Sequence, residues 1–285
     1  MLQVAPGENS ARVVALQILL NRSKAIAPKL TTDGDFGDKT RAAVDLYRDK
    51  EMRTSGPKGV ADPALWRFLL ARAELQVVDA VDVTDPLLLE HTVPEISKWG
   101  DPIVLGAMSN GIAQLVREIR ARVKGNRSLM MLRLHGHGSA GLHAVSHGSR
   151  RIWKDFPIDP VQAQSVISEE VIPKVMPQLR QLEPLFNDFG FVELHSCHVA
   201  EGPKGASFVR KLAVALQAPV RAAHNVQQAK DVFILTGPTS TGFPGSGGLK
   251  DWGYGRKEGV RATYGPPAPP PPERGPKPGT LISRY

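Results

Sequence analysis

The sequence predicts an α/β protein with a mostly parallel sheet, preceded by a small three-helix domain and followed by a Pro-rich tail. Three observations lead to this prediction. Short apolar runs alternate with helical stripes between residues 101 and 262, two helical stripes flank a Gly/Asp-rich loop within residues 1–75, and residues 265–278 contain eight prolines. Alternating strands and helices are typical of parallel sheets, whereas proline lacks the N–H group that a central strand needs.

Composition excludes several classes of protein. The 285 residues are 41% hydrophobic and 22% charged, which suits a packed core rather than a disordered chain. No apolar run approaches the roughly 18 residues that a membrane-spanning helix requires. The single cysteine, Cys197, excludes an internal disulfide framework and a Cys-rich zinc module. The net charge of +8 favours anionic partners but does not choose among nucleic acid, wall polymers and lipid head groups.

The N-terminal region, residues 1–75, is predicted to contain three short helices. Ser10 precedes the first apolar stripe as an N-cap candidate, and the second stripe begins after Asp38. The third helix has Asp62 as a candidate cap and Pro63 at its first position, where the missing N–H group costs nothing. We expect these helices to form one small domain.

The residues of the loop between the first two helices, TTDGDFGDKT, can each be given a structural role. Asp33 can accept hydrogen bonds from neighbouring backbone amides, and Gly34 and Gly37 can adopt positive φ. Phe36 can fix the loop to the core, and Thr40 can cap the next helix. These roles are structural, so they do not by themselves specify a ligand.

The same residues resemble a known family. LQILLN (16–21), DGDFGDKTRAAV (33–44) and Trp66 with Leu69 are similar to the peptidoglycan-binding domain 1 family, over about 60 residues. The resemblance implies a three-helix module that binds the cell wall, with Asp33, Gly34, Phe36, Gly37 and Thr40 as its motif. The segment MRTSGPKGV departs from the family by replacing a shorter turn.

The central region divides into a linker and an α/β domain. Residues 76–100 are weakly patterned and contain two prolines, so we interpret them as a linker. Within residues 101–262, buried strands are predicted where short apolar runs occur and helices where apolar residues recur at helical spacing. The strand candidates are LMMLRL (129–134), GFVELH (190–195), APVRAA (218–223) and DVFILT (231–236), and the clearest helical stripes lie at 112–123 and 208–216.

Reactive side chains follow two of these strands. LRLHGHGSAG (132–141) and FVELHSCHVAEGPKG (191–205) each place histidines where a strand ends, and the second also places Cys197 there. Ligands of open α/β sheets bind at the carboxyl ends of strands. Cys197 is therefore a candidate nucleophile and His137 its base, with the amide of Gly138 holding the developing oxyanion. The alternative for a single cysteine is an inert, buried structural role.

HGSAG (137–141) and LHSCHVAEGPKGASFVRKLA (194–213) resemble a bacterial caspase-like family, the domain of unknown function 4347. The later GLKDWGYG (248–255) is similar to its closing segment, so the resemblance spans about residues 104–255. It implies a caspase-like sheet with a His–Cys dyad, here His137 and Cys197. Gly136 and Ser196 stand where the family has Ser and Gly.

Two alternative interpretations of this histidine and cysteine cluster stay open. Because of the departures, His135 competes with His137 as the base, whereas His195, Ser196 and His198 are expected to be structural or to line the pocket. The other reading is a zinc site with three ligands taken from a set of five residues. That set is His135, His137, His195, Cys197 and His198. The spacings are loose and no acidic base stands beside them, so we expect no metal and no cofactor.

The expected function is hydrolysis of a peptide bond by a Cys–His dyad, brought to the cell envelope by the wall-binding module. The expected partners are peptidoglycan and a protein or peptide substrate, with no nucleic acid and no membrane span. The N-terminus has no secretory signal pattern, so we expect cytoplasmic synthesis and a non-classical route to the envelope, as for a toxin-like effector. The alternatives are a non-catalytic wall-binding scaffold and a zinc-dependent peptidoglycan hydrolase. The tail, residues 263–285, is expected to be disordered and able to dock a partner protein.

Overall fold

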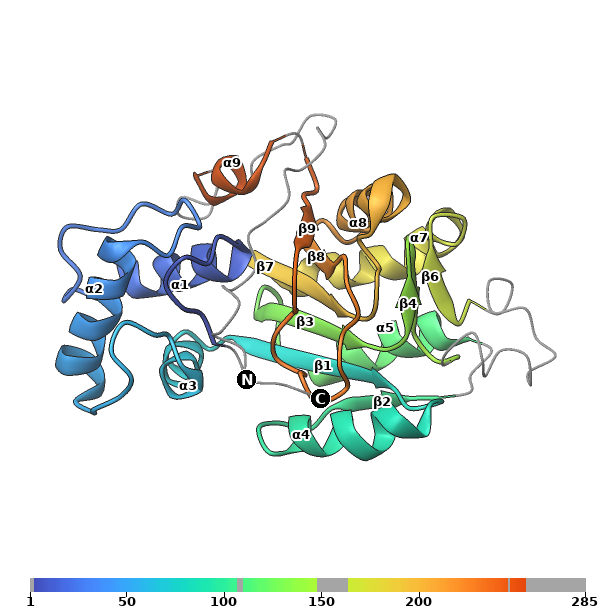
Figure 1. Cartoon of the computed structure of the whole chain (residues 1–285), viewed down its shortest axis with the longest axis horizontal. Coiled ribbons are helices and arrows are strands. Elements are labelled where there is room, and N and C mark those ends of the chain that lie inside the picture. Colours follow the sequence, from blue (N-terminus) through green and yellow to red (C-terminus); the bar gives the residue numbers. More distant parts are fainter. Residues whose placement is uncertain (1–2, 107–109, 148–163, 246, 255–285) are drawn as a thin grey trace.

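The structure, a computed structural model, describes residues 3–106, 110–147, 164–245 and 247–254. Its centre is a six-stranded sheet in the order β2-β1-β3-β7-β8-β9 (Figure 1). The strands are β1 (Gln76–Asp82), β2 (Ile103–Leu105), β3 (Leu129–His135), β7 (Phe186–His195), β8 (Val220–Ala223) and β9 (Thr239–Gly242). All neighbours pair in parallel except β9, which runs antiparallel to β8. The predicted α/β class with a mostly parallel sheet is confirmed.

Helices cover one face of the sheet through a continuous apolar core. The residues that point to this face alternate along the strands, for example Leu132 and Leu134 of β3 and Val192 and Leu194 of β7. They pack against α5 (Gly111–Arg122), α7 (Ile172–Leu179), the 3₁₀ turn η3 (Arg180–Leu185) and α8 (Gly202–Leu216). A small antiparallel sheet follows β3 and consists of β4 (Gly138–Ser139), β5 (Leu142–Ala144) and β6 (Val166–Ser168).

The N-terminal helices cover part of the opposite face. They are α1 (Ala11–Asn21), α2 (Asp38–Tyr47), the π turn η1 (Arg48–Met52) and α3 (Pro63–Arg72), and they lie with α9 (Leu249–Tyr254) at one end of the molecule (Figure 1). Their core also contains Met130 and Met131 of β3 and Phe189 and Phe191 of β7. The three predicted helices are present, but they share one hydrophobic core with the sheet.

The predicted linker at residues 76–100 is wrong. This segment contains β1, which lies between β2 and β3, and then the π turn η2 (Leu88–Thr92) and α4 (Val93–Ser97). The strand was hidden because Asp79 interrupts its apolar pattern, yet Asp79 is buried through a two-pronged ion pair with Arg133 of β3. A buried charge is tolerated where it is paired, so polarity did not mark a loop here.

The strand predicted at 231–236 is also wrong, because the edge strand is β9, eight residues further on from the start of that run. The apolar residues of 231–236 pack against other parts of the protein without forming a strand. Val232 packs with Val81, Leu88 and Ile96 in a small separate cluster beneath η2 and α4. The segment is therefore a loop whose side chains cover the sheet.

Local signals in the N-terminal region are mostly as expected. Asp62 caps α3 by accepting the Leu65 amide at 2.9 Å. Ser10 stands at the N-cap of α1, but its hydroxyl donates to Glu8 instead of capping. Gly34 has φ of +77°, whereas Gly37 has φ of −87°, so the expected positive φ at Gly37 is wrong.

The loop between α1 and α2, which carries the predicted binding motif, is held together by Gln17 of α1. Its amide nitrogen lies within hydrogen-bond distance of Asp33 and Thr40, and its oxygen accepts the Gly34 amide. Phe36 is buried in the core, as predicted. Thr40 donates to the Asp35 carbonyl rather than capping α2. The motif residues therefore build the loop itself.

Two predictions concern other parts of the chain. The Pro-rich tail at 263–285 lies outside the described residues. No helix among the described residues has the length and apolar character needed to cross a bilayer.

Candidate functional site

Two turns meet at the carboxyl edge of the sheet. β3 ends at His135 and β7 at His195, and these residues are paired in register. A Cβ atom at Gly138 would lie 3.0 Å from the carbonyl oxygen of Cys197 and 2.8 Å from the Cβ of Ser196. Only glycine permits this approach, so the turn that carries His137 lies directly against the turn that carries Cys197.

His137 is oriented by an aspartate. Its Nε2 lies 2.6 Å from Oδ2 of Asp85, and 31% of the His137 side chain is exposed. Asp85 follows β1 and is itself held by the Leu87 amide, which donates to its other oxygen at 2.9 Å. Because an ionised carboxylate only accepts, Nε2 carries the proton in neutral His137, which leaves Nδ1 as the free base.

Cys197 is a free, partly exposed thiol. Its sulfur lies 3.4 Å from the backbone nitrogen of Gln227, which donates to it. The sulfur is 3.6 Å from the carbonyl oxygen of the same residue. The loop after β8 therefore fixes the position of the sulfur at the end of β7 while leaving it accessible.

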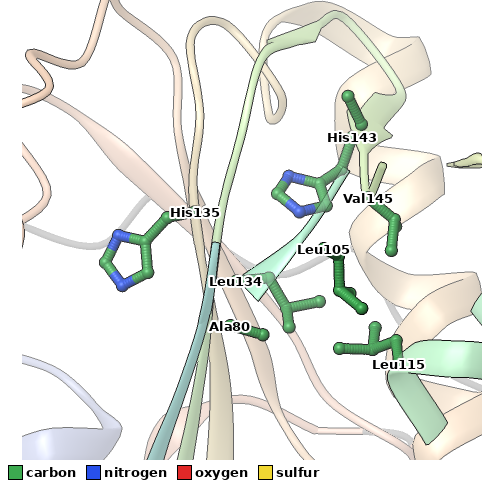
Figure 2. A pocket seen from close by; sticks show the side chains of 8 residues that line it. Ala80, Leu105, Leu115, Leu134, His135, His143 and Val145 are labelled. Carbon is green, nitrogen blue, oxygen red and sulfur yellow. The ribbon is translucent and has the colours of Figure 1, made fainter. Parts of the chain in front are cut away.

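A buried pair supports the cysteine turn from below. Nδ1 of His143 lies 2.5 Å from the hydroxyl of Ser196, the residue before Cys197. Burial lowers the pKa of His143 to about 3, so this imidazole stays neutral. His143 also borders a cavity of about 10 Å³, which is about one water molecule in size (Figure 2). The cavity is too small for a substrate, and the Ser196 hydroxyl is engaged by His143.

The imidazole rings of His135 and His195 lie against each other beneath the turns, with an angle of 36° between their planes. Their ring centroids are 4.7 Å apart, and each side chain is at most 5% exposed. His135 lies 2.9 Å from Asp79, and His195 lies 3.2 Å from Glu193. Figure 2 shows the imidazoles of His135 and His143 on opposite sides of β3. His135 is therefore bound within the sheet face, whereas His137 is accessible.

His198 turns away from this pair. It has φ of +59°, its Nδ1 donates to the His224 carbonyl at 3.1 Å, and it pairs with Glu201 at 3.0 Å. These contacts fix the turn that leads into α8. They engage the His198 side chain with His224 and Glu201.

Stability is expected to fall as the pH drops from 7 to 5. Burial lowers the pKa of His143 and of His195 to about 3, against about 6.5 in an unfolded chain. Below pH 6.5 these two histidines therefore bind protons in the unfolded chain but not in the folded protein. Each of them lowers the free energy of unfolding by about 2 kcal/mol at pH 5. Urea unfolding at the two pH values measures this loss. His91→Ala, which removes a partly exposed histidine, should leave the loss unchanged, and a free energy of unfolding independent of pH would contradict the assignment.

The zinc reading is not supported by the geometry. Among the residues that the structure describes, no group of three or more His, Cys, Asp or Glu side chains is arranged to hold a metal ion. The Nε2 atoms of His135, His137 and His195 each face a carboxylate instead.

The sheet face beneath the site carries a buried layer of paired charges. Arg133 binds Asp79 with two hydrogen bonds, at 2.6 and 2.7 Å. Arg12 of α1 binds Glu193 in the same two-pronged way, at 2.6 and 2.5 Å. Glu193 is fully buried, and Arg12 together with His195 holds its carboxyl pKa well below the usual range against the desolvation that raises it. The N-terminal region thus completes the charge balance beneath the site.

Sequence reasoning missed Asp85. Other aspartates of the chain are engaged elsewhere, since Asp188 pairs with Arg127 and Asp251 accepts the Gly248 amide. Asp85 lies just after β1, so recognising that strand would have placed it at the same sheet edge as His137. The missed signal was the strand itself.

The comparisons with known proteins give one family. No curated protein matches the chain significantly, and no solved structure does. Residues 88–230 match a family described as Domain of unknown function (DUF4347). The match contains both His137 and Cys197 but begins after Asp85. Since it covers half of the sequence, the chain belongs to the DUF4347 family.

Proposed function

We propose that this protein is a caspase-like cysteine peptidase in which Cys197 is the nucleophile, His137 the general base and Asp85 the residue that orients His137. The observation that carries the proposal is the 2.6 Å contact between His137 and Asp85, on a turn packed against Cys197. A nucleophile, a base and a group that holds the base are the parts that covalent acyl transfer requires.

The chemistry follows from the orientation of His137. Nδ1 takes the thiol proton of Cys197, and the sulfur attacks the carbonyl carbon of the peptide. The tetrahedral intermediate collapses as the imidazolium of His137 gives its proton to the leaving amine, which breaks the C–N bond and leaves a thioester. His137 then deprotonates a water molecule that attacks the thioester, and the acid product and the thiol are released. Asp85 keeps the proton on Nε2 throughout.

The amide of Gly138 is suited to hold the oxyanion. Ala144 donates to the His137 carbonyl at 2.8 Å, which makes these two residues a hydrogen-bonded pair of the β4–β5 hairpin. Gly138 is opposite His143 in the next pair along, which in an antiparallel ladder exchanges no hydrogen bonds. Its N–H group therefore points away from β5 and remains available for a substrate oxygen.

Alkylation at pH 6 tests whether Cys197 is activated. An unperturbed thiol is under about 1% thiolate at this pH. We expect iodoacetamide to label the wild-type protein several-fold faster than the His137→Ala variant, because the imidazolium of His137 stabilises the thiolate. His91→Ala serves as the matched control and should react like the wild type. Equal rates in all three proteins would mean that Cys197 is an inert thiol, as in the scaffold alternative. In that case no peptide of a library should be cleaved.

We also propose that the N-terminal helices bring this activity to the cell envelope. The support is the resemblance of residues 16–69 to peptidoglycan-binding modules, together with the net charge of +8. A toxin-like effector that acts at the envelope fits this pairing. Sedimentation of the full chain with insoluble peptidoglycan tests it, and binding that vanishes at high salt would reduce the interaction to charge alone.

A further inference from the structure

A second hollow lies away from Cys197, where the N-terminal helices meet the sheet. Its volume is about 280 Å³, and its lining residues come mainly from α3, β1 and the end of α4. Ligand sites are frequent where two structural units meet, and this volume suits a molecule of small-metabolite size. The residues that matter here are Arg67 and Leu70 of α3, Val77 and Asp79 of β1, Trp99 after α4, and Arg133 of β3.

The polar end of this α3–β1–α4 cavity is formed by the ion pair of Arg133 and Asp79, and it offers a hydrogen-bond donor rather than an acceptor. Both oxygens of Asp79 are already engaged by Arg133, and one of them also by His135, so Asp79 has little acceptor capacity left. Arg133 is 2% exposed, and its buried Nη1 has no hydrogen-bond partner among the described residues. A cavity-lining guanidinium with an unused donor favours an acceptor of negative charge.

The open end adds a second cation and an aromatic ring. The guanidinium carbon of Arg67 lies 5.1 Å from the centre of the Trp99 ring. Trp99 is 43% exposed although it is the largest kind of apolar side chain. An exposed tryptophan on the wall of a cavity offers a surface for a flat apolar group, and the neighbouring Arg67 keeps the potential positive.

We propose that the α3–β1–α4 cavity binds a small carboxylic acid with an apolar, preferably aromatic, body. The carboxylate accepts a hydrogen bond from Nη1 of Arg133, and Arg67 adds positive charge at the open end. The apolar body packs between Trp99 and the aliphatic residues Leu70 and Val77. This site is separate from the proposed peptidase site, because Cys197, His137 and Asp85 are not among its lining residues.

The test measures the binding of indole-3-acetate to the full chain by isothermal titration calorimetry. We expect saturable binding with one site per chain. Indole-3-acetamide has the same shape without the charge, and it should bind at least about tenfold more weakly, because it loses the ionic contact. Equal affinities for the two probes, or no saturation with either, would overturn the proposal.

Variants locate the binding within the cavity. Arg67→Glu reverses the charge at the open end and should weaken indole-3-acetate binding by about tenfold or more. Trp99→Ala removes the aromatic wall and should weaken both probes. Arg117→Glu makes the same charge change on α5, at a side chain that is 69% exposed and does not line the cavity, and should bind like the wild type. If Arg67→Glu and Arg117→Glu weaken binding equally, the effect is one of net charge and the cavity is not the site.

Discussion

Cys197→Ala and His137→Ala are each expected to lower peptide hydrolysis by about four orders of magnitude, because the nucleophile and its base act as one unit. For the same reason the double variant should be little worse than either single one. Asp85→Asn is expected to cost about a hundredfold or more, since the amide no longer holds the proton on Nε2 of His137. Turnover of a peptide identified from a library measures all four.

Folding has to be separated from chemistry in these variants. His137 and Cys197 are partly exposed, so their replacement by alanine should leave the thermal unfolding midpoint close to that of the wild type. His91→Ala should retain full activity. Hydrolysis that survives in Cys197→Ala would end the peptidase proposal, whereas a loss in His135→Ala with full activity in His137→Ala would transfer the base role to His135.

Arg12→Met is expected to lower the free energy of unfolding by about 3–5 kcal/mol, because it leaves the carboxylate of Glu193 buried without its main partner. The two side chains are 2% and 0% exposed, so water cannot replace the lost contacts. The guanidinium of Arg12 also donates to the Phe233 carbonyl at 2.9 Å, and that contact is lost as well. Chemical denaturation at pH 7 measures the change.

An exposed ion pair supplies the control. Arg117→Met breaks the pair with Glu118, whose side chains are 69% and 39% exposed, and should cost less than about 1 kcal/mol. Adding Glu193→Gln to Arg12→Met should recover part of the loss, because the buried charge is then removed. A cost for Arg12→Met no larger than that for Arg117→Met would show that the buried pair contributes nothing to stability.

The strands were predictable where burial depends on local apolar sequence and not where it depends on a distant partner. LMMLRL and GFVELH predict β3 and β7 because apolar residues occur on both faces of each run and only one ionised residue, Arg133 or Glu193, interrupts it. β1 has two aspartates in seven residues, and Asp79 is buried only through Arg133, 54 residues away. A pairing over that distance leaves no trace in a local pattern.

The candidate site follows the same division. His137, Gly138 and Cys197 were assigned from their positions after two apolar strands, and the structure brings their two turns into contact. Asp85 depends on β1 and was missed with it. The attachment of the N-terminal helices was also missed, because Met131 and Phe191 look like any strand residue until their partners are known.

The buried layer of paired charges limits how the N-terminal helices and the sheet can be recombined in evolution. Glu8 and Arg12 of the N-terminal region approach Glu193 and Arg221 of the sheet, with Arg221 3.5 Å from Glu8 and 3.7 Å from Glu193. A recombination event that exchanged the N-terminal helices for another domain would remove Arg12, the two-pronged partner of Glu193, and leave this buried carboxylate with His195 and the more distant Arg221. The helical region and the sheet therefore have to be inherited together, and relatives that lack these helices are expected to carry apolar residues at the positions of Glu193 and Arg221.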